Sequence, residues 1–330
     1  MKNSKNILVT GGAGYIGSHA CKALSRAGYT PVAYDNLIFG HRAAVKWGPL
    51  VEADIADREK LDHALSAYRP LAVMHFAAFA YVGESVENPG KYYRNNVAGS
   101  LCLLEALRDH GIGRIIFSST CATYGVPETV PLKEDHPQRP INPYGYSKTV
   151  IEQMLKDFDA AHGMRFICLR YFNAAGADPE GELGEDHDPE THLIPLVLGA
   201  AAGKKERLTI FGDDYDTPDG TCIRDYIHVE DLARAHVLGL KALESGAPSS
   251  IYNLGNGKGF SVKQVLDAAL EITGRKIPVQ LGPRRPGDSP CLVGDSRKII
   301  RELGWRPRLN SLDKIIETSW RWHQHHPEGF

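Results

Sequence analysis

Two hydrophobic patterns alternate along the first half of the chain. Short runs that are apolar at almost every position are separated by longer stretches in which apolar residues recur every three or four positions. The short runs predict strands near 5–10, 31–35, 49–53, 71–76, 113–118 and 165–171, and the longer stretches predict helices near 14–27, 57–67, 91–110 and 143–162. Apolar strands that alternate with helices are typical of a parallel sheet covered by helices on both faces. The pattern therefore predicts an α/β fold with a doubly wound sheet.

The pattern becomes less regular after Gly176. Residues 178–191 are acidic and contain proline and glycine, which predicts a loop. Further helices are expected near 229–245, 261–273 and 311–325, with loops at 212–221 and 282–290. We expect a first domain over residues 1–176 and a smaller C-terminal substrate domain over 177–330, with some segments, such as 229–245, returning to the first domain.

A glycine-rich turn joins the first predicted strand to the first predicted helix. Gly12, Gly14 and Gly17 have the G-x-G-x-x-G spacing, and Gly11 widens it to G-x-x-G-x-x-G. Glycines at these places allow a tight turn and a close approach of pyrophosphate to the backbone, at the N-terminus of a helix. The residues of this turn that we expect at a dinucleotide are Gly11, Gly14, Tyr15, Ile16 and Gly17.

The second predicted strand ends in Asp35, which lies 18 residues after Gly17. An acid at this place accepts a hydrogen bond from the adenosine ribose and repels a 2′-phosphate. The turn and the acid together predict a Rossmann-type domain that binds NAD in preference to NADP. A solvated aspartate after an ordinary glycine turn is the alternative.

Three later strand ends carry residues suited to the same ligand, since a doubly wound sheet binds its cofactor along the carboxyl ends of its strands. Asp54 can accept from the adenine amino group, and Ile55 can cover the ring. The small residues of Phe76-Ala77-Ala78 allow close backbone approach. Ser118 and Thr120 offer hydroxyls where nicotinamide and substrate should meet, although a hydroxyl at a strand end can also cap a helix.

Tyr144 and Lys148 form the most informative pair in the chain. Pro143 suits the first position of a helix, and the phenol and the ammonium would then lie one turn apart on one face. We expect the positive charge of Lys148 to lower the pKa of Tyr144, so that the phenol can act as a general base near neutral pH. A surface tyrosine beside a solvated lysine is the alternative.

Composition and charge exclude several other classes of protein. The net charge of −2 leaves no bulk footprint for nucleic acid. No apolar stretch approaches the length of a membrane span, and the N-terminus leads directly into the first strand, so we expect neither a membrane span nor a signal peptide. Six scattered cysteines without a C-x-x-C pair fit a reducing, cytoplasmic compartment. The tail histidines 323, 325 and 326 have no carboxylate or thiolate at ligand spacing, so we expect no metal site.

Several longer segments resemble the UDP-glucose 4-epimerase family, a branch of the extended short-chain dehydrogenase/reductases. The resemblance runs from residue 6 to about residue 328. Its most specific parts are RYFN at 170–173 and RDYIHV at 224–229. The other matching segments are GGAGYIGSH at 11–19, YDNL at 34–37, FAA at 76–78, VGES at 82–85, GTCI at 220–223 and RRPGD at 284–288.

This resemblance implies reversible inversion at C4 of UDP-galactose and UDP-glucose, through a 4-keto intermediate and transient NADH, in galactose and nucleotide-sugar metabolism. Tyr144 would take the proton of the 4-hydroxyl group, Lys148 would hold the nicotinamide ribose, and Thr120 would bind the reacting oxygen. Further cofactor residues that it implies are Asn36, Asn95, Ser118 and Tyr171. The residues that it implies for the UDP-sugar are Asn173, His192, Leu193, Phe211, Arg224, Arg285, Asp288 and Leu292.

Two departures from the family pattern leave the sugar open. Ala80 stands where many members have a lysine beside the cofactor pyrophosphate, and the surrounding AYVGES segment is similar to members that epimerise UDP-xylose and UDP-arabinose. Leu292 is intermediate between the bulky tyrosine and the small residue of relatives, so the acceptance of N-acetylhexosamines is open too. For Arg224, an ion pair with Asp225 or Glu230 is the alternative to a role in binding pyrophosphate.

Other functions and the assembly can also be weighed. A nucleotide-sugar dehydratase needs an acid pair after the catalytic threonine, where this chain has Cys121-Ala122. A non-enzymatic NAD-binding regulator would not need Tyr144, Lys148 and Thr120 together. The family pairs the helices corresponding to 91–110 and 143–162, which predicts a homodimer. The apolar positions outside a single core-facing stripe are Val97, Leu101, Leu104, Val150, Met154 and Phe158.

Overall fold

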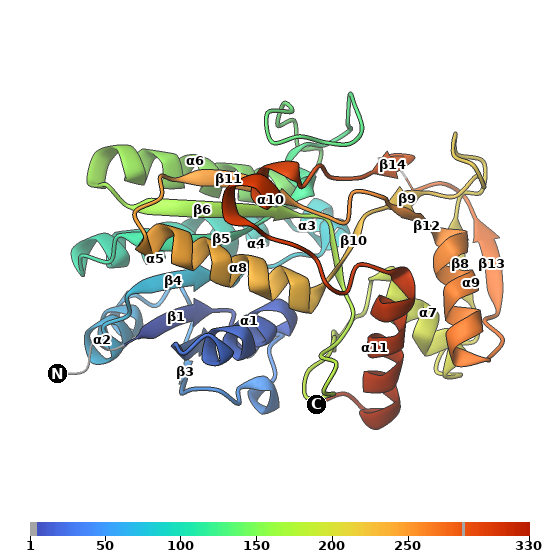
Figure 1. The fold of residues 1–330 in the computed structure, drawn as a ribbon, viewed down its shortest axis with the longest axis horizontal. Helices are drawn as coiled ribbons and strands as arrows, with labels where there is room; N and C mark the ends of the chain where they lie inside the picture. The colour runs from blue at the N-terminus through green and yellow to red at the C-terminus, as the bar shows by residue number, and fades with distance from the viewer. Residues whose placement is uncertain (1–4, 286–287) are drawn as a thin grey trace.

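The computed structural model describes residues 5–285 and 288–330, so Pro286 and Gly287 of the RRPGD segment and the first four residues lie outside it. A seven-stranded parallel sheet forms its centre, in the order β11-β6-β5-β4-β1-β2-β3 (Figure 1). Its strands are β1 (Asn6–Thr10), β2 (Thr30–Asp35), β3 (Leu50–Glu52), β4 (Ala72–His75), β5 (Arg114–Thr120), β6 (Arg165–Tyr171) and β11 (Ser250–Leu254). The strand order reverses between β1 and β4, and such a reversal opens a crevice at the carboxyl ends of the strands. The predicted α/β fold class is confirmed.

Helices cover both faces of the sheet, as the continuously apolar strands predicted. Neighbouring residues of β1 illustrate the reason, since Ile7 packs into one apolar core and Leu8 into the other. The helices on the first face are α1 (Tyr15–Arg26) and α8 (Val229–Glu244), and those on the second are α2 (Arg58–Tyr68), α5 (Gly99–Asp109) and α6 (Pro143–His162).

The segment predicted as one helix over 91–110 is less uniform than its pattern suggests. It contains α4 (Pro89–Tyr92), a π-helical stretch (Tyr93–Ala98) and then α5, and it follows the short helix α3 (Val82–Glu87). Asn96 lies in the π-helical stretch and is completely buried. A π-bulge of this kind often lies at a functional site, because it changes the direction in which side chains leave the helix.

Most of the remaining elements gather at the carboxyl ends of the strands, to the right in Figure 1, whereas α10 (Arg297–Leu303) packs on β11 and α8 of the central sheet. Helices α7 (Leu193–Ala201), α9 (Val262–Thr273) and α11 (Leu312–His325) share an apolar core of their own. The short strands and remaining helices are β7 (Asn173–Ala175), β8 (Leu208–Phe211), β9 (Ile223–Arg224), β10 (Tyr226–His228), β12 (Phe260–Ser261), β13 (Val279–Gly282), β14 (Cys291–Leu292), α10 (Arg297–Leu303) and the 3₁₀ turns Arg42–Ala44 and Cys121–Thr123. Part of the chain after residue 176 belongs to the central sheet, because α8 packs on α1 and β11 pairs with β6.

Candidate active site

The glycine turn is packed so tightly that side chains are excluded from it. A Cβ atom on Gly17 would lie 2.0 Å from the carbonyl oxygen of Gly11, and one on Gly11, whose φ is +71°, would lie 2.7 Å from the backbone nitrogen of Ala77. Helix α1 then begins without a side-chain cap and without an acid in its first turn. The first N–H groups of a helix have no intrahelical acceptor, so the backbone of Tyr15, Ile16 and Gly17 offers donors to an anion.

The side chain of Tyr15 is engaged elsewhere. Its hydroxyl donates to the carbonyl oxygen of Gly176 at 2.6 Å, where the first half of the chain passes into the second. Burial raises the pKa of Tyr15 well above the ordinary tyrosine value, so the group is a neutral donor. The backbone N–H of Tyr15 is therefore the donor that this residue can offer to a cofactor at the glycine turn.

Asp35 is held at the end of β2 by the turn itself. The N–H groups of Ala13 and Leu37 each donate to one of its carboxylate oxygens at 2.9 Å. Burial raises the pKa of Asp35, and the two backbone hydrogen bonds oppose that effect. Each carboxylate oxygen has a second lone pair, so the group can still accept from a ribose hydroxyl.

The adenine side of the predicted site is also assembled. Asn36 donates to Asp54 at 2.8 Å, and the other carboxylate oxygen of Asp54 accepts from the N–H of Ala56 at 2.8 Å. Ile55 is buried, and a Cβ atom on Gly99 would lie 2.8 Å from its side chain. Asn36, Asp54 and Ile55, which are all predicted cofactor contacts, therefore lie together.

The segment after β4 closes against β1. The N–H groups of Phe76 and Ala77 both donate to the carbonyl oxygen of Thr10, at 2.9 and 3.1 Å. Ala78 follows them and is partly buried. This backbone contact explains why small residues follow Phe76, since the turn and this segment approach each other at backbone distance.

Asn95 reaches this segment through its neighbour. It donates to the side-chain oxygen of Asn96 at 2.9 Å, and the same oxygen accepts from the N–H of Phe79 at 2.9 Å. Asn96 also donates to Ser147 of α6 at 3.0 Å. Sequence reasoning missed Asn96, because nothing in an Asn-Asn pair distinguishes the member that faces the core.

Tyr144 and Thr120 meet where α6 begins. The helix starts at Pro143 as predicted, and Asn142 caps it by accepting from the N–H of Gly145 at 2.8 Å. Gly145 packs so closely on the turn after β5 that a Cβ atom there would lie 2.5 Å from the carbonyl oxygen of Ala122. This contact places the phenol of Tyr144 beside the hydroxyl of Thr120.

The expected lowering of the Tyr144 pKa by Lys148 is wrong for this arrangement of protein groups. Burial raises the pKa of Tyr144 to about 12, and the neighbouring Thr120 hydroxyl reverses only part of that effect. The ammonium group of Lys148 instead donates to the carbonyl oxygen of Ser118 at 2.8 Å, and burial lowers its own pKa to about 7. Spacing along a helix predicted a shared face, but not where the lysine would point.

Behind this site lies a buried ion pair that sequence reasoning did not assign. Arg170 donates to both carboxylate oxygens of Glu152, at 2.8 and 2.6 Å, and Ser119 donates to Glu152 at 2.6 Å. Because Glu152 lies on α6 and Arg170 on β6, the pair fixes the helix against the sheet. The available signal was spacing, since Tyr144, Lys148 and Glu152 follow one another at intervals of four residues.

Ser118 and Tyr171 also meet behind the site. Their hydroxyl groups share a short hydrogen bond, and burial raises the pKa of Tyr171. Both residues are predicted cofactor contacts, and they come from the neighbouring strands β5 and β6.

The predicted pyrophosphate and ribose residues converge beyond the strands. Arg224 pairs with Asp288 at 3.2 Å, and the guanidinium of Arg285 lies 4.0 Å from the centre of the Phe211 ring. The alternative that pairs Arg224 with Asp225 or Glu230 is wrong. Asp225 instead accepts from the backbone N–H groups of Asn256, Gly257 and Gly294, at 2.7 to 3.1 Å.

Three other predicted substrate residues, Asn173, Leu292 and His192, lie on different elements. Asn173 lies in β7, and its N–H donates to the carbonyl oxygen of Asp225 at 3.0 Å. Leu292 lies beside Arg224 in the β9–β14 pair and packs against a small apolar cluster that includes Phe172. His192 precedes Leu193, the first residue of α7, and its ring nitrogen faces the carboxylates of Glu185 and Glu190 at 3.0 and 2.9 Å.

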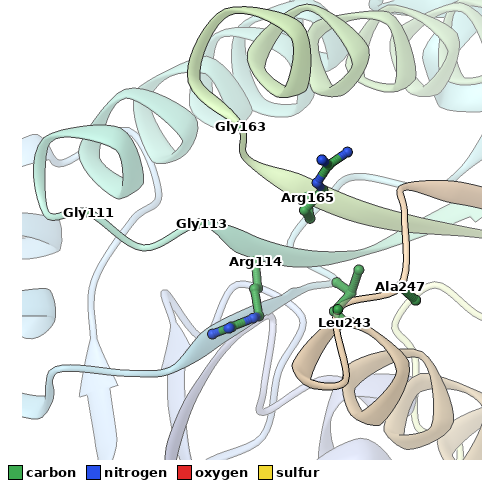
Figure 2. Close-up of a pocket in the computed structure, with 8 residues that line it drawn as sticks. Gly111, Gly113, Arg114, Gly163, Arg165, Leu243 and Ala247 are labelled. Carbon is green, nitrogen blue, oxygen red and sulfur yellow. The ribbon is translucent and has the colours of Figure 1, made fainter.

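Two surface hollows lie at the opposite, amino end of the sheet. The first has a volume of about 360 Å³, and Figure 2 shows that the side chains of Arg114 and Arg165 point in different directions there. The second has a volume of about 490 Å³ and shares Gly111, Gly113 and Arg114 with it. None of the predicted site residues lines either hollow.

Comparison with known proteins agrees with the motifs. Residues 7–255 match the NAD dependent epimerase/dehydratase family. A UDP-glucose 4-epimerase from Rhizobium meliloti is 52% identical over 329 residues, which cover 100% of both chains. The crystal structure of UDP-glucose 4-epimerase from Brucella ovis in complex with NAD has 53% identity and a TM-score of 0.95, and the match covers 96% of this chain and 98% of that one.

A further solved structure is similar over almost the whole chain. It is a UDP-glucose 4-epimerase from Stenotrophomonas maltophila with bound NAD and formylated UDP-arabinopyranose, and it has 39% identity and a TM-score of 0.95, covering 98% of this chain and 99% of that one. The resemblance predicted from the motifs is thereby confirmed. This chain belongs to the NAD-dependent epimerase/dehydratase family and, within it, to the UDP-glucose 4-epimerases.

Proposed function

We propose that this enzyme reversibly inverts C4 of UDP-galactose and UDP-glucose through a 4-keto intermediate. The observation that carries the proposal is the close packing of Gly145 on the turn after β5, which places Tyr144 beside Thr120, while Lys148 donates to the carbonyl oxygen of Ser118. Strand β5 lies two places from β1 in the sheet, so this group shares its edge with the glycine turn. A base, a hydroxyl donor and a dinucleotide cradle are what oxidation of a secondary alcohol requires.

Each polar group has a role in this reaction. Bound NAD would supply the acceptor for the hydride that leaves C4 of the sugar. Its oxidised form also carries a positive charge, which favours the phenolate and so offsets the effect of burial on the pKa of Tyr144. Tyr144 takes the proton of the 4-hydroxyl group, Thr120 holds the reacting oxygen, and Lys148 binds the ribose. Asp35 selects NAD over NADP by repelling a 2′-phosphate.

The sugar must turn over between the two hydride transfers, so the firm contacts belong on UDP. Arg224 and Arg285 supply guanidinium groups, which suit a pyrophosphate because they bind phosphate oxygens in pairs. Asp288 orients Arg224 and accepts from the uridine ribose. Asn173, His192, Leu193 and Phe211 complete this end of the proposed site, and Leu292 borders the sugar.

A pentose activity is the second candidate. Ala80 is exposed and carries no charge, and the relative from Stenotrophomonas maltophila contains a formylated UDP-arabinopyranose. A loosely held ring discriminates weakly, and one missing CH₂OH group is worth only about 1–3 kcal/mol. UDP-xylose and UDP-arabinose are therefore expected to interconvert within about a hundredfold of the hexose rate, whereas dTDP-sugars are poor substrates.

Parallel assays of the purified enzyme on UDP-galactose and UDP-xylose test this proposal. Turnover of both supports it, and undetectable pentose turnover beside brisk hexose turnover removes the second candidate. Pentose turnover alone would replace UDP-galactose as the principal substrate. Failure on every UDP-sugar with NAD present would refute the proposed function.

We further propose a cytoplasmic homodimer formed by α5 and α6. Leu101 of α5 and Val150 of α6 are exposed, and Val97 is partly buried, which supports an apolar contact surface. Leu104 is fully buried in the core and takes no part in it. All six cysteines are free, and no helix among the described residues is long and apolar enough to cross a membrane. Light scattering that returns the mass of one 36.3 kDa chain at micromolar concentration would refute the dimer.

A further inference from the structure

The loop between Gly176 and α7 brings two carboxylates and two imidazoles to one point. Glu185, His187, Glu190 and His192 each direct one potential ligand atom at a common centre, and these atoms all lie within 4.8 Å of one another. Glu185 is buried, and the other three are partly buried. The proposed reaction assigns no role to Glu185, His187 or Glu190.

Four distances between carboxylate oxygens and imidazole nitrogens in this group are close to those around a four-coordinate ion. One oxygen of Glu185 lies 3.3 Å from Nδ1 of His187 and 3.0 Å from Nδ1 of His192. The oxygens of Glu190 lie 3.6 Å and 2.9 Å from the same two nitrogens. A tetrahedral site with bonds of about 2.0–2.1 Å has ligand atoms about 3.3 Å apart. Nδ1 of His187 is buried without a hydrogen-bond partner, although both carboxylates lie within 3.6 Å of it.

A second cluster of carboxylates on the same loop pairs with a cation that the protein itself supplies. Asp178, Glu180 and Glu182 surround the ammonium group of Lys22, at 2.6, 3.0 and 2.5 Å. No lysine or arginine pairs with Glu185 or Glu190 within residues 5–285 and 288–330. The two negative charges of the carboxylates would balance a divalent cation, and the imidazoles would bind it in their neutral form. The buried group would then carry no net charge.

We propose that Glu185, His187, Glu190 and His192 bind a divalent transition-metal ion, with Zn²⁺ as the preferred occupant. Imidazole and carboxylate together suit Zn²⁺, whereas Ca²⁺ and Mg²⁺ select oxygen ligands alone. Four protein ligands leave no open coordination position, so the site is structural and not catalytic. The position of the site indicates what the ion would stabilise. The ring of Tyr15 lies 6.1 Å from the ring of His187, and His192 directly precedes α7. The ion would pin the loop between the glycine turn and α7.

The alternative is that both histidines are protonated and no metal ion is bound. Burial lowers the histidine pKa values, but the two neighbouring glutamates reverse the effect and raise them to about 9 for His187 and about 10 for His192. Two histidinium–glutamate ion pairs would then stabilise the loop without a metal. Metal binding by the intact protein distinguishes the two.

The test uses the tag-free full chain and two matched substitutions three residues apart. Glu185→Gln removes a proposed ligand, and Glu182→Gln makes the same chemical change in the Lys22 group. After dialysis against Zn²⁺, elemental analysis should find about one Zn²⁺ per chain in the native protein and in E182Q. In E185Q and H187Q the affinity should fall by more than about 100-fold, since even loss of a group that only supports a ligand costs 10- to 100-fold. Zn²⁺ should raise the melting temperature only where it binds.

Co²⁺ provides a reading that does not depend on how well the variants fold. Bound to the native protein, Co²⁺ should show the intense visible absorption of tetrahedral coordination. The weak spectrum of octahedral Co²⁺, or no Zn²⁺ in the native protein, would overturn the proposal. Equal binding by native protein, E185Q and H187Q would assign the ion to other groups, such as the tail histidines, and would overturn it too.

Discussion

The two ends of the central sheet show how one scaffold separates chemistry from stability. At the carboxyl end, residues from β1, β2, β4, β5 and α6 bring hydroxyl, carboxylate and ammonium groups together. At the amino end, three glycines with φ of +68° to +85°, namely Gly111, Gly163 and Gly246, follow the ends of α5, α6 and α8. Glycine accepts this left-handed conformation, which lets a helix end. Arg114 and Arg165 lie beside these helix ends, where a positive charge complements the helix dipoles.

Parallel strands explain the difference. All strand ends of one kind meet at one edge, so polar residues that follow different strands become neighbours at the carboxyl edge. The amino edge instead receives the ends of the connecting helices. The hollows at the amino edge therefore result from the way in which the helices end. We expect substitutions at the carboxyl edge to change catalysis or cofactor binding, and substitutions at the amino edge to leave activity nearly unchanged.

The largest expected effect is at Tyr144. Tyr144→Phe should lower turnover by roughly 10²- to 10⁴-fold, because it removes a positioned acid–base group. Binding of UDP, followed by calorimetry, should hardly change. Tyr146→Phe is the matched control, since that ring is two residues away and 49% exposed. Full turnover in Y144F would remove the phenol from the mechanism.

Asp35 should control the cofactor. Asp35→Asn should weaken NAD binding by roughly 10- to 100-fold, because it exchanges a charged acceptor for a neutral one, and it should narrow the preference over NADP. Equilibrium dialysis with both nucleotides measures the two effects. Asp62→Asn on the surface of α2 serves as the control for loss of one carboxylate. An unchanged ratio of NAD to NADP affinity would show that selectivity lies elsewhere.

Lys148 should make stability depend on pH. Burial lowers its pKa to about 7, whereas the unfolded chain keeps a value near 10.4. Between about pH 7 and pH 10 the unfolded state therefore binds more protons, and the contribution of Lys148 to stability rises with pH by up to about 1.4 kcal/mol per pH unit. Urea unfolding of the wild type and of Lys148→Met at pH 7, 8 and 9, both without NAD, measures this term. The stability of the wild type minus that of the variant should rise with pH, and parallel curves would contradict the prediction.

The smallest effect is expected at the amino end. Arg165→Ala should leave kcat/KM within about twofold and change the free energy of unfolding by no more than about 1 kcal/mol, because its ion pair with Asp159 is largely solvated and 3.4 Å long. Steady-state kinetics and urea unfolding check both values. A tenfold loss of kcat/KM would break the contrast between the two ends.

The positions of many candidate site residues could be predicted, because these residues follow strands that the sequence pattern predicts. Apolar runs located β1 to β6 within one or two residues, and Asp35, Asp54, Phe76 and Thr120 stand at or just after their ends. Helix α7 was not predicted, because Leu193 to Ala201 is apolar on all sides and contains Pro195. Periodicity cannot identify a helix that has no polar face.

The Glu185–His192 segment shows another limit of sequence reasoning. Its four candidate ligands stand within eight residues, but they lie in a loop without periodicity, so their spacing predicted no common centre. Lys22 is separated from Asp178 by 156 positions, and nothing local to either residue indicates that they pair. Pairing over such distances depends on how the chain returns upon itself.

The sequence by itself determined the sheet, the glycine turn and the family, and it supplied the proposed reactive groups, because these depend on local pattern and residue type. Only the tertiary structure decided how those groups are tuned. Burial raises the pKa of Tyr144 and lowers that of Lys148, and Arg224 pairs with Asp288 instead of with its neighbour in the chain. The physical reason is that desolvation and ion pairing depend on which groups surround a side chain in space. A linear spacing places a residue on a helix face, but it does not specify what that face meets.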